Sequence, residues 1–330
     1  MNNDDIIKIG IIGTGRIARR FVKECRFVKY IKLVSVYNPH EGSAGRFVDG
    51  FCDEMEDDGL GVPTATDNLN AFMQGIDAVY IASPHETHFG YIIQALTMDK
   101  HVLCEKPMCL MLDEAKAVFA LATAKRLVVM EAIKTAYCPG FARLIEVLES
   151  GVIGQPRYVD ACFTKLEKPG VRELVDIKYG GSFLELGSYV MLPMFAIFGS
   201  KYTALSFESM KNTSGIDIFT KGDFRFDKGL ATVTCGLGVK SEGRLLVAGE
   251  EGYIIAEAPW WKLSHFEAHF EDPMKIVSYD CAFEGDGLRY EIMEFINHIN
   301  GSGSVSGMME CSIIMADVMG KFMGLGASRQ

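Results

Sequence analysis

Two features that would indicate other classes of protein are missing from this chain. No C-x-x-C occurs among its nine cysteines, so neither a zinc cluster nor a disulfide framework is suggested. No apolar run is long enough to cross a bilayer. Positively charged residues are fewer than negatively charged ones, and the net charge of −10 argues against nucleic acid as a partner. This net charge is still compatible with a local basic pocket for an anionic cofactor. Free cysteines and the lack of a signal peptide predict a cytoplasmic protein.

Two domains are expected from the length of 330 residues, and 48% hydrophobic residues supply a core that needs no metal or disulfide. Strand and helix signals alternate over residues 1–125, as in a doubly wound parallel sheet. After helices expected at Pro139–Ser150 and Ser182–Phe198, short strand-like runs follow one another, which predicts a mainly antiparallel sheet. We therefore predict an α/β protein whose second domain, residues 126–330, is α+β.

The expected strands can be written as residue ranges. Those of the alternating first part of the chain are Ile6–Ile12, Lys32–Tyr37, Val62–Thr66, Ala78–Ser83 and His101–Cys104, and a further strand is expected at Leu127–Met130. Those of the second domain are Arg157–Thr164, Thr203–Glu208, Ile216–Thr220, Leu230–Cys235, Arg244–Val247, Tyr253–Glu257 and Phe266–Phe270. Two helices, Leu288–Ile299 and Met308–Met323, are expected near the end of the chain.

A glycine-rich segment follows the first predicted strand and opens the first predicted helix. It has the G-x-G-x-x-A form of a dinucleotide-binding fingerprint. Gly13 permits a tight turn, Gly15 lets the backbone approach a pyrophosphate, and Ala18 lets the helix pack close to the strand. The N-terminus of the helix then attracts the phosphates. A purely structural strand–turn–helix is the competing interpretation.

Lys106 ends a predicted strand, at the carboxyl edge where ligands bind in open α/β sheets. Pro107 follows it, and a residue before proline is pushed into an extended conformation. The lysine is therefore expected on a stiff turn with its ammonium group directed into the cleft. The competing interpretation is a solvated surface lysine, as most lysines are.

Glu185 and Tyr189 lie four residues apart in the helix predicted after Gly180-Gly181, so they share one helix face. The glycine pair allows close backbone approach by a ligand. Tyrosine is a poor acid at neutral pH unless a nearby cation lowers its pKa, and Lys106 is a candidate for that cation. Alternatively, Tyr189 is a buried core residue and Glu185 an ordinary helix carboxylate.

These segments belong to a set of motifs that occur in order along nearly the whole chain: Gly13–Ala18, Asp77–Pro84 with Thr87-His88, Glu105-Lys106-Pro107, Met130–Ala132, Gly151–Gly154 and Gly180–Ser182. The set resembles the glucose–fructose oxidoreductase / inositol dehydrogenase / MocA (Gfo/Idh/MocA) family of nicotinamide-dependent oxidoreductases. The resemblance implies a dinucleotide-binding Rossmann domain over residues 1–125. It also implies a substrate-binding and oligomerisation domain over residues 126–330.

Two positions depart from the commonest pattern of that family, which has Asp and then Gly-x-His after the glycine pair. Glu185 stands at the aspartate position and Tyr189 at the histidine position. The Gly-x-Tyr form, and Arg172 upstream, resemble the branch that contains dihydrodiol and D-xylose dehydrogenases. The resemblance assigns Tyr189 as the acid/base and Lys106 as its electrostatic partner. It assigns substrate contacts to Lys106, Arg172, Glu185 and Tyr189.

A nicotinamide cofactor, NAD or NADP, is implied by the same resemblance. Its expected contacts are Gly13, Thr14, Gly15, Arg16, Ile17, Ala18, Asn38, Ser83, Pro84, His88, Glu105 and Lys106. An acid at the end of the second strand would favour NAD and an arginine NADP, but Asn38 stands there. Asn38 can bind a ribose hydroxyl without repelling a phosphate, and Arg16 and Arg46 are candidate phosphate partners. These residues slightly favour NADP over NAD as the cofactor.

Two further segments have weaker implications. His85-Glu86-Thr87-His88 lacks the H-E-x-x-H spacing, so no metal site is expected, and His88 is interpreted as a residue of the cleft wall. Trp260-Trp261 belongs either to the core of the sheet or to an exposed interface, and we favour the interface because aromatic residues are enriched there.

The sequence thus predicts a dehydrogenase or reductase acting on CH–OH groups. It would transfer a hydride between nicotinamide and a hydroxyl or carbonyl carbon of a sugar, polyol or cyclic diol. The expected partners are that small molecule and further copies of the chain, as a homodimer or homotetramer, with no nucleic acid or membrane. The alternative is a non-catalytic, cofactor-bound sensor or regulatory protein of the same fold.

Overall fold

The computed structural model describes residues 6–52, 62–302 and 306–327, which form two compact units. The first unit comprises the described residues up to Lys134 together with Gly285–Ile313. The second comprises Thr135–Glu284 and the described residues from Ile314 onward. This division differs from a single boundary after residue 125, because the first unit extends through one more strand and includes a later segment of the chain.

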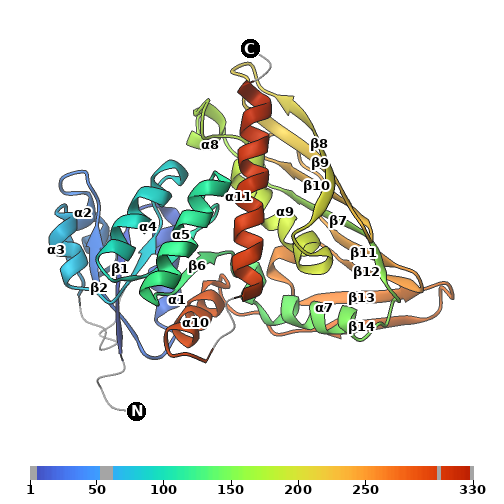
Figure 1. The fold of residues 1–330 in the computed structure, drawn as a ribbon, viewed down its shortest axis with the longest axis horizontal. Helices are drawn as coiled ribbons and strands as arrows, with labels where there is room; N and C mark the ends of the chain where they lie inside the picture. Colours follow the sequence, from blue (N-terminus) through green and yellow to red (C-terminus); the bar gives the residue numbers. More distant parts are fainter. Residues whose placement is uncertain (1–5, 53–61, 303–305, 328–330) are drawn as a thin grey trace. The chain divides into compact units, whose positions relative to one another are not determined.

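The first unit contains a six-stranded parallel sheet with the order β3-β2-β1-β4-β5-β6 (Figure 1). Its strands are β1 (Ile7–Ile12), β2 (Ile31–Tyr37), β3 (Thr64–Thr66), β4 (Ala78–Ile81), β5 (His101–Glu105) and β6 (Val129–Ala132). Its helices are α1 (Arg16–Cys25), α2 (Ser43–Cys52), α3 (Leu69–Gln74), α4 (His88–Thr97), α5 (Leu112–Lys125) and α10 (Leu288–Ile299). Every residue of β4 is buried, as expected for a strand covered on both faces. The predicted doubly wound parallel sheet is confirmed.

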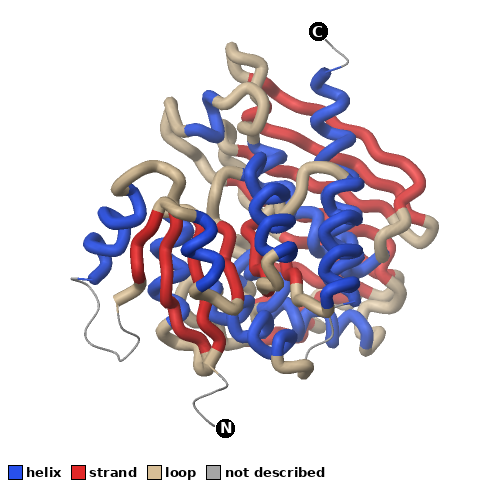
Figure 2. Tube along the Cα trace, turned by 60° about the vertical axis from the view of Figure 1, so that its left-hand side comes forward, coloured by secondary structure: helices blue, strands red, loops and turns tan. Residues whose placement is uncertain are grey.

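The strand order reverses at β1, which has β2 on one side and β4 on the other. The strands of this sheet are drawn in red in Figure 2. Since all these strands are parallel, the residues that follow β1, β4 and β5 lie at the same edge of the sheet. Gly13, Ser83 and Lys106 occupy those positions. Such a reversal is where ligands bind in open α/β sheets.

The segment Gly285–Ile313 is fastened to α1 by one buried carboxylate. Glu24 accepts hydrogen bonds from Arg289 Nε at 2.9 Å and from Asp286 N at 3.2 Å. Burial raises the pKa of Glu24, but its hydrogen bonds to Arg289 and Asp286 outweigh burial and lower that pKa overall. This clasp explains why the segment joins the first unit, and its partners are too distant in sequence for a local pattern to indicate it.

The second unit contains an eight-stranded sheet, within the described residues, with the order β14-β13-β12-β11-β7-β10-β9-β8. All neighbours are antiparallel except β7 and β10, so the mainly antiparallel prediction is confirmed in a mixed sheet. The strands are β7 (Pro156–Thr164), β8 (Tyr202–Lys211), β9 (Asp217–Phe226), β10 (Leu230–Gly236), β11 (Leu245–Gly249), β12 (Gly252–Ala256), β13 (His265–Phe270) and β14 (Ile276–Asp280). Strand β14 was not predicted, because it is an edge strand that is mostly exposed and lacks alternation.

Helix α9 (Ser182–Phe198) lies against β7, β9 and β10 of this sheet (Figure 1). The other helices beyond the first sheet are α6 (Lys134–Tyr137), α7 (Pro139–Glu149), α8 (Arg172–Val175) and α11 (Ser306–Ala327), with the short 3₁₀ turn η3 (Trp260–Lys262). A second 3₁₀ turn, η2 (His85–Thr87), lies between β4 and α4 of the first unit. Among the described residues, no helix combines the length and apolar character needed to cross a membrane.

Trp260 belongs to the core, and our interface interpretation is wrong for this residue. Its side chain is fully buried, and its Nε1–H donates to the carbonyl of Cys162 at 2.8 Å. Indole burial is favoured when the N–H finds such an acceptor. Trp261 is half-buried and stacks on Phe163, with ring centroids 3.6 Å apart.

Candidate active site

Two glycines in the turn after β1, Gly13 and Gly15, are explained by different features of the structure. Gly13 has φ of +103°, and a Cβ there would lie 2.4 Å from the carbonyl oxygen of Ala82. Gly15 has φ of −80°, and among the described residues nothing lies within 4 Å of a Cβ added to it. Gly13 is therefore required by the fold itself. The fold leaves open the space beside Gly15, as the pyrophosphate interpretation requires.

Helix α1 begins directly at this open space. Gly15 is its N-cap, and among the described residues no side chain caps it. The first N–H groups of a helix lack intrahelical acceptors, and together with the helix dipole they attract anions. Arg16 and Ile17 lie in this first turn, whereas Ala18 is fully buried, as expected for the residue that packs the helix on the sheet. The turn therefore fits a dinucleotide phosphate.

Asn38 lies at the end of β2 and is bonded at both ends of its amide. Its Nδ2 donates to Thr14 Oγ1 at 2.9 Å, and its Oδ1 accepts the N–H of His40 at 2.9 Å. These bonds join the end of β2 to the glycine turn. Nearby in sequence, Arg46 is exposed and donates to Ser43 Oγ at 3.0 Å.

The turn after β5 is held by two buried carboxylates. The Glu105 carboxylate accepts hydrogen bonds from the hydroxyl group of Tyr80 at 2.5 Å and from the backbone N–H of Lys106 at 3.3 Å. Glu131, on β6, accepts the N–H of Met108 at 2.9 Å. Lys106 is only 8% exposed, so it is not the solvated surface lysine of the competing interpretation. The backbone N–H groups of Lys106 and Met108 are both hydrogen-bonded to carboxylates, so the backbone on either side of Pro107 is held in place.

His88 departs from the prediction of a cleft-wall residue, since it is fully buried. Its Nδ1 lies 2.9 Å from the carbonyl oxygen of Pro107, and its Nε2 lies 2.9 Å from that of Ser83. Burial lowers the pKa of His88 overall, although the two carbonyls raise it, and the charge of Lys106 lowers it further. The ring of His88 is thus enclosed beside the carbonyl groups of Pro107 and Ser83 and does not line an open cleft.

Two hydroxyl groups and a backbone carbonyl are hydrogen-bonded to one another in the turn between β4 and α4. Ser83 Oγ lies 2.6 Å from Thr87 Oγ1, and Thr87 Oγ1 donates to the carbonyl of Pro84 at 2.7 Å. Because the Thr87 proton is used on Pro84, the Ser83 hydroxyl is the donor to Thr87. Pro84 itself is exposed at the edge of the sheet.

In the second unit, Glu185 and Tyr189 are the only residues between Ser182 and Val190 that are not buried. Their four-residue spacing places both on one accessible strip of α9, as predicted. Tyr189 is only partly buried, so it is not a buried core tyrosine, and its ring packs edge-on against Phe163 with centroids 5.4 Å apart. This strip brings a carboxylate and a phenol to the same surface.

The glycine pair before α9 serves the chain itself, which corrects our expectation of a ligand approach. A Cβ at Gly181, where φ is +111°, would lie 1.9 Å from Asp217 Oδ1. A Cβ at Gly180 would lie 2.5 Å from the carbonyl oxygen of Asp176. Asp217 is buried and accepts the N–H of Phe183 at 2.9 Å, so it caps α9. The cap sets where the strip of α9 begins.

Arg172 begins α8 and pairs with Asp176 at 3.3 Å. The Asp176 carboxylate also accepts the N–H groups of Lys178 and Tyr179, each at 3.0 Å. These hydrogen bonds to Tyr179 and Lys178, together with Arg172, lower the pKa of Asp176 despite some burial. The pair joins Arg172 to the turn that leads into α9.

Three residues of these networks were missed at the sequence level: Glu131, Asp217 and Phe163. Each acts on a partner at least 23 residues away in the chain, namely Met108, Phe183 and Tyr189. The Met130-Glu131-Ala132 motif was a signal for the first of them. No local pattern indicates the other two.

Comparisons with known proteins agree with this geometry. Residues 7–133 match the model of an oxidoreductase family with an NAD-binding Rossmann fold. The human trans-1,2-dihydrobenzene-1,2-diol dehydrogenase is 28% identical over 66% of each chain. The scyllo-inositol 2-dehydrogenase (NADP(+)) of Bacillus subtilis is 29% identical over 59% of each chain. These alignments span less than two thirds of the relatives' own lengths.

The fold is also found in a solved structure, a 3-ketoreductase from Actinomadura kijaniata in complex with NADP and TDP-benzene. The likeness covers 95% of this chain and 96% of that one, with a TM-score of 0.80 and 21% identity. The family match begins at β1 and ends just after β6, so it covers the whole parallel sheet. The first unit is therefore similar, over residues 7–133, to the Gfo/Idh/MocA family of oxidoreductases.

Proposed function

We propose that this protein is an NAD(P)-dependent dehydrogenase or reductase acting on a CH–OH or carbonyl carbon of a sugar, polyol or cyclic diol. The observation that carries the proposal is the open space beside Gly15 at the uncapped start of α1. A nicotinamide cofactor bound there supplies or accepts the hydride. The protein's own residues must bind the phosphates, orient the substrate and move one proton.

We assign the transfer of the proton to and from the substrate oxygen to the phenol group of Tyr189. In reduction it donates the proton to the substrate oxygen, and in oxidation it accepts one. Lys106, as a cation, lowers the pKa of this tyrosine and orients the reacting oxygen. Glu185 and Arg172 contact substrate hydroxyls. The accessible strip of α9 supports these roles for Glu185 and Tyr189.

The substrate class is suggested by the names of the relatives. A cyclic diol is the substrate named for the human relative, and an inositol for the one from Bacillus subtilis. Both are six-membered rings with neighbouring hydroxyl groups. A carboxylate such as Glu185 can accept hydrogen bonds from such hydroxyls.

NADP is the preferred cofactor in this proposal. The Bacillus relative is named for NADP, and the Actinomadura structure contains it. In this chain an amide, Asn38, occupies the end of β2, where no carboxylate repels a 2′-phosphate. Exposed Arg46 is the first lysine or arginine that follows that position along the chain. Contacts with the rest of the cofactor are assigned to the first turn of α1, Ser83 and Pro84.

A panel of sugars, inositols and cyclic diols should reveal turnover when NAD(P)H absorbance is followed. We expect activity on at least one polyol or its ketone, and tighter binding of NADPH than of NADH in a fluorescence titration. Stoichiometric cofactor binding without turnover on the whole panel would instead indicate the non-catalytic sensor. Tighter binding of NADH would reverse the cofactor assignment.

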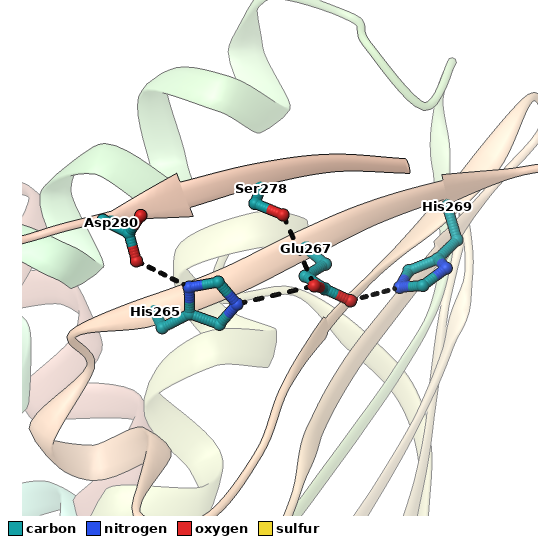
Figure 3. A network of polar contacts seen from close by, with 5 residues as sticks. All are labelled: His265, Glu267, His269, Ser278 and Asp280. Carbon is teal, nitrogen blue, oxygen red and sulfur yellow. Dashed lines mark hydrogen bonds and ion pairs between the residues drawn. The ribbon is translucent and has the colours of Figure 1, made fainter. Parts of the chain in front are cut away.

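We further propose a cytoplasmic homodimer or homotetramer that forms through the second sheet. The registers of β10, β7, β11, β12, β13 and β14 place one row of residues across a single face. The row contains Leu230, Tyr158, Ala248, Tyr253, His269 and Ile276. Beside it lies a polar network in which His265 bonds Asp280 and Glu267 bonds His269 (Figure 3). Exposed Leu230, Tyr253 and Ile276 give the face apolar area that a partner would bury.

Light scattering at micromolar concentration should give the mass of a dimer or tetramer. Leu230→Glu would place a charge at the β10 end of this row, and we expect it to shift the mass toward the monomer. Lys116→Glu, on the exposed side of α5, serves as the control and should leave the mass unchanged. A monomeric wild-type protein would rule out this proposal.

A further inference from the structure

Tyr80, on β4, is a fully buried tyrosine whose ring is held on two sides. The ring stacks on Phe21 of α1, with centroids 3.8 Å apart and the two planes 11° apart. Its backbone is fixed by the parallel pairing of β4 with β5, in which Tyr80 lies opposite Leu103. The phenol oxygen is therefore a fixed point inside the first unit, and its hydroxyl group donates to Glu105 Oε1 at 2.5 Å.

The Glu105 carboxylate uses both of its oxygens within the protein. While Oε1 accepts the hydrogen bond of Tyr80, Oε2 accepts the backbone N–H of Lys106 at 3.3 Å. A short hydrogen bond from a hydroxyl group to a carboxylate is stronger than one between neutral groups. The bond to Lys106 is the longer of the two, so it depends on the orientation that the shorter bond gives to the carboxylate. Glu105 is only 8% exposed, which limits competition from water.

We propose that Tyr80 is a positioning residue, whose hydroxyl group holds the Glu105 carboxylate in the orientation that accepts the N–H of Lys106. The inference rests on the proposed function, because Lys106 is the cation assigned there to the proton-transfer step. Tyr80 acts through Glu105 and, being fully buried, does not reach the substrate itself. A displacement of a catalytic group by about 1 Å is enough to lower turnover markedly.

Two substitutions and their combination isolate this role. Tyr80→Phe removes a single oxygen atom and keeps the ring that stacks on Phe21. Glu105→Ala removes the acceptor, and with it the hydrogen bonds to Tyr80 and to the N–H of Lys106. If Tyr80 acts through Glu105, then Tyr80→Phe should have no further effect once Glu105 is alanine.

Hydrogen–deuterium exchange of the Lys106 amide measures the tie without any substrate. We expect this amide to exchange roughly tenfold faster in Tyr80→Phe, the effect of weakening one hydrogen bond to a charged group. Exchange should rise at least as much in Glu105→Ala and no further in the double variant. Unchanged exchange of Lys106 in a folded Tyr80→Phe protein would overturn the proposal.

Thermal unfolding gives a readout that needs no activity. Removing both partners of a buried hydrogen bond costs less stability than leaving one of them unsatisfied. The double variant should therefore unfold at the same temperature as Glu105→Ala or at a higher one. A lower unfolding temperature would mean that the Tyr80 hydroxyl group serves a partner other than Glu105, which contradicts the proposal. This comparison remains decisive even if Tyr80→Phe alone does not fold.

Steady-state kinetics connect the tie to the reaction. We expect kcat to fall roughly five- to tenfold in Tyr80→Phe, with NADPH affinity within about twofold of wild type. In the Glu105→Ala background the same substitution should leave kcat unchanged. Losses that multiply in the double variant would show that Tyr80 acts independently of Glu105. A tenfold loss of NADPH affinity with kcat unchanged would assign the pair to the cofactor site, and either result would refute the proposal.

Tyr202→Phe is the matched control. The hydroxyl group of Tyr202 also donates to a carboxylate, Asp317 Oδ2 at 2.8 Å, but this pair belongs to the second unit. Its loss should leave the exchange of Lys106 and the value of kcat unaltered, and an equal change in this variant would count against a specific role for Tyr80. If the wild-type protein has no turnover, the proposed function fails, while exchange and unfolding still decide the role of Tyr80.

Discussion

Turnover is expected to fall by roughly 10²–10⁴-fold in both Lys106→Met and Tyr189→Phe, the range typical of lost general acid–base catalysis. Methionine fills much of the space of lysine but removes the cation that we propose as the electrostatic partner of Tyr189. Phenylalanine keeps the ring, and with it the contact to Phe163, but removes the proton donor. Steady-state turnover on whichever polyol or sugar the wild type accepts measures both effects.

The two variants should differ from each other in their dependence on pH. In Lys106→Met the tyrosine keeps its hydroxyl but loses the cation, so its pKa rises and any residual activity moves to higher pH. In Tyr189→Phe no such rise in activity is expected. NADPH affinity should change little in Tyr189→Phe, because the phenol is assigned to the substrate.

Lys116→Met and Tyr30→Phe serve as matched controls, since both side chains are exposed and lie outside the proposed site. They should retain wild-type turnover. If Tyr189→Phe also retained it, the proton would be handled by another group. Glu185, on the same strip of α9, would then be the first candidate, because the ring of His88 is enclosed.

Gly15→Val should weaken NADPH binding by at least about tenfold while the protein stays folded, which corresponds to roughly 1.4 kcal/mol. The reason is the open space at this position: a Cβ added there has nothing within 4 Å among the described residues, and the valine side chain would occupy the place assigned to the pyrophosphate. A fluorescence titration measures the affinity, and thermal unfolding checks the fold.

Gly13→Ala is the informative comparison, because its Cβ would lie 2.4 Å from the carbonyl oxygen of Ala82 at a φ of +103°. This variant should lose stability, by roughly 1–3 kcal/mol for strain of this kind. Gly90→Val, whose Cβ also enters open space on α4, should change neither stability nor binding by a comparable amount. Unaltered NADPH affinity in folded Gly15→Val would remove the basis for the cofactor site.

Local signals were sufficient for the first sheet. Each of its strands was predicted within two or three residues, because apolar runs of strand length alternate with helix patterns and glycine or proline ends them. The helices Ser182–Phe198 and Leu288–Ile299 were predicted with the observed bounds. The exposure of Glu185 and Tyr189 also followed from a short-range rule, their spacing of four residues.

The sequence by itself therefore determined the fold class, the glycine turn and the face of α9 that carries the proposed acid. Only the tertiary structure decided that Gly285–Ile313 returns to the first unit, that Trp260 is core and that Asp217, rather than a ligand, fills the space left by Gly181. It also decided that His88 is fully buried, with its ring beside the carbonyl oxygens of Ser83 and Pro107. The physical reason is the range of the interactions. Strand, turn and helix preferences act between residues a few positions apart, whereas caps, buried ion pairs and packing join residues whose separation along the chain carries no local pattern.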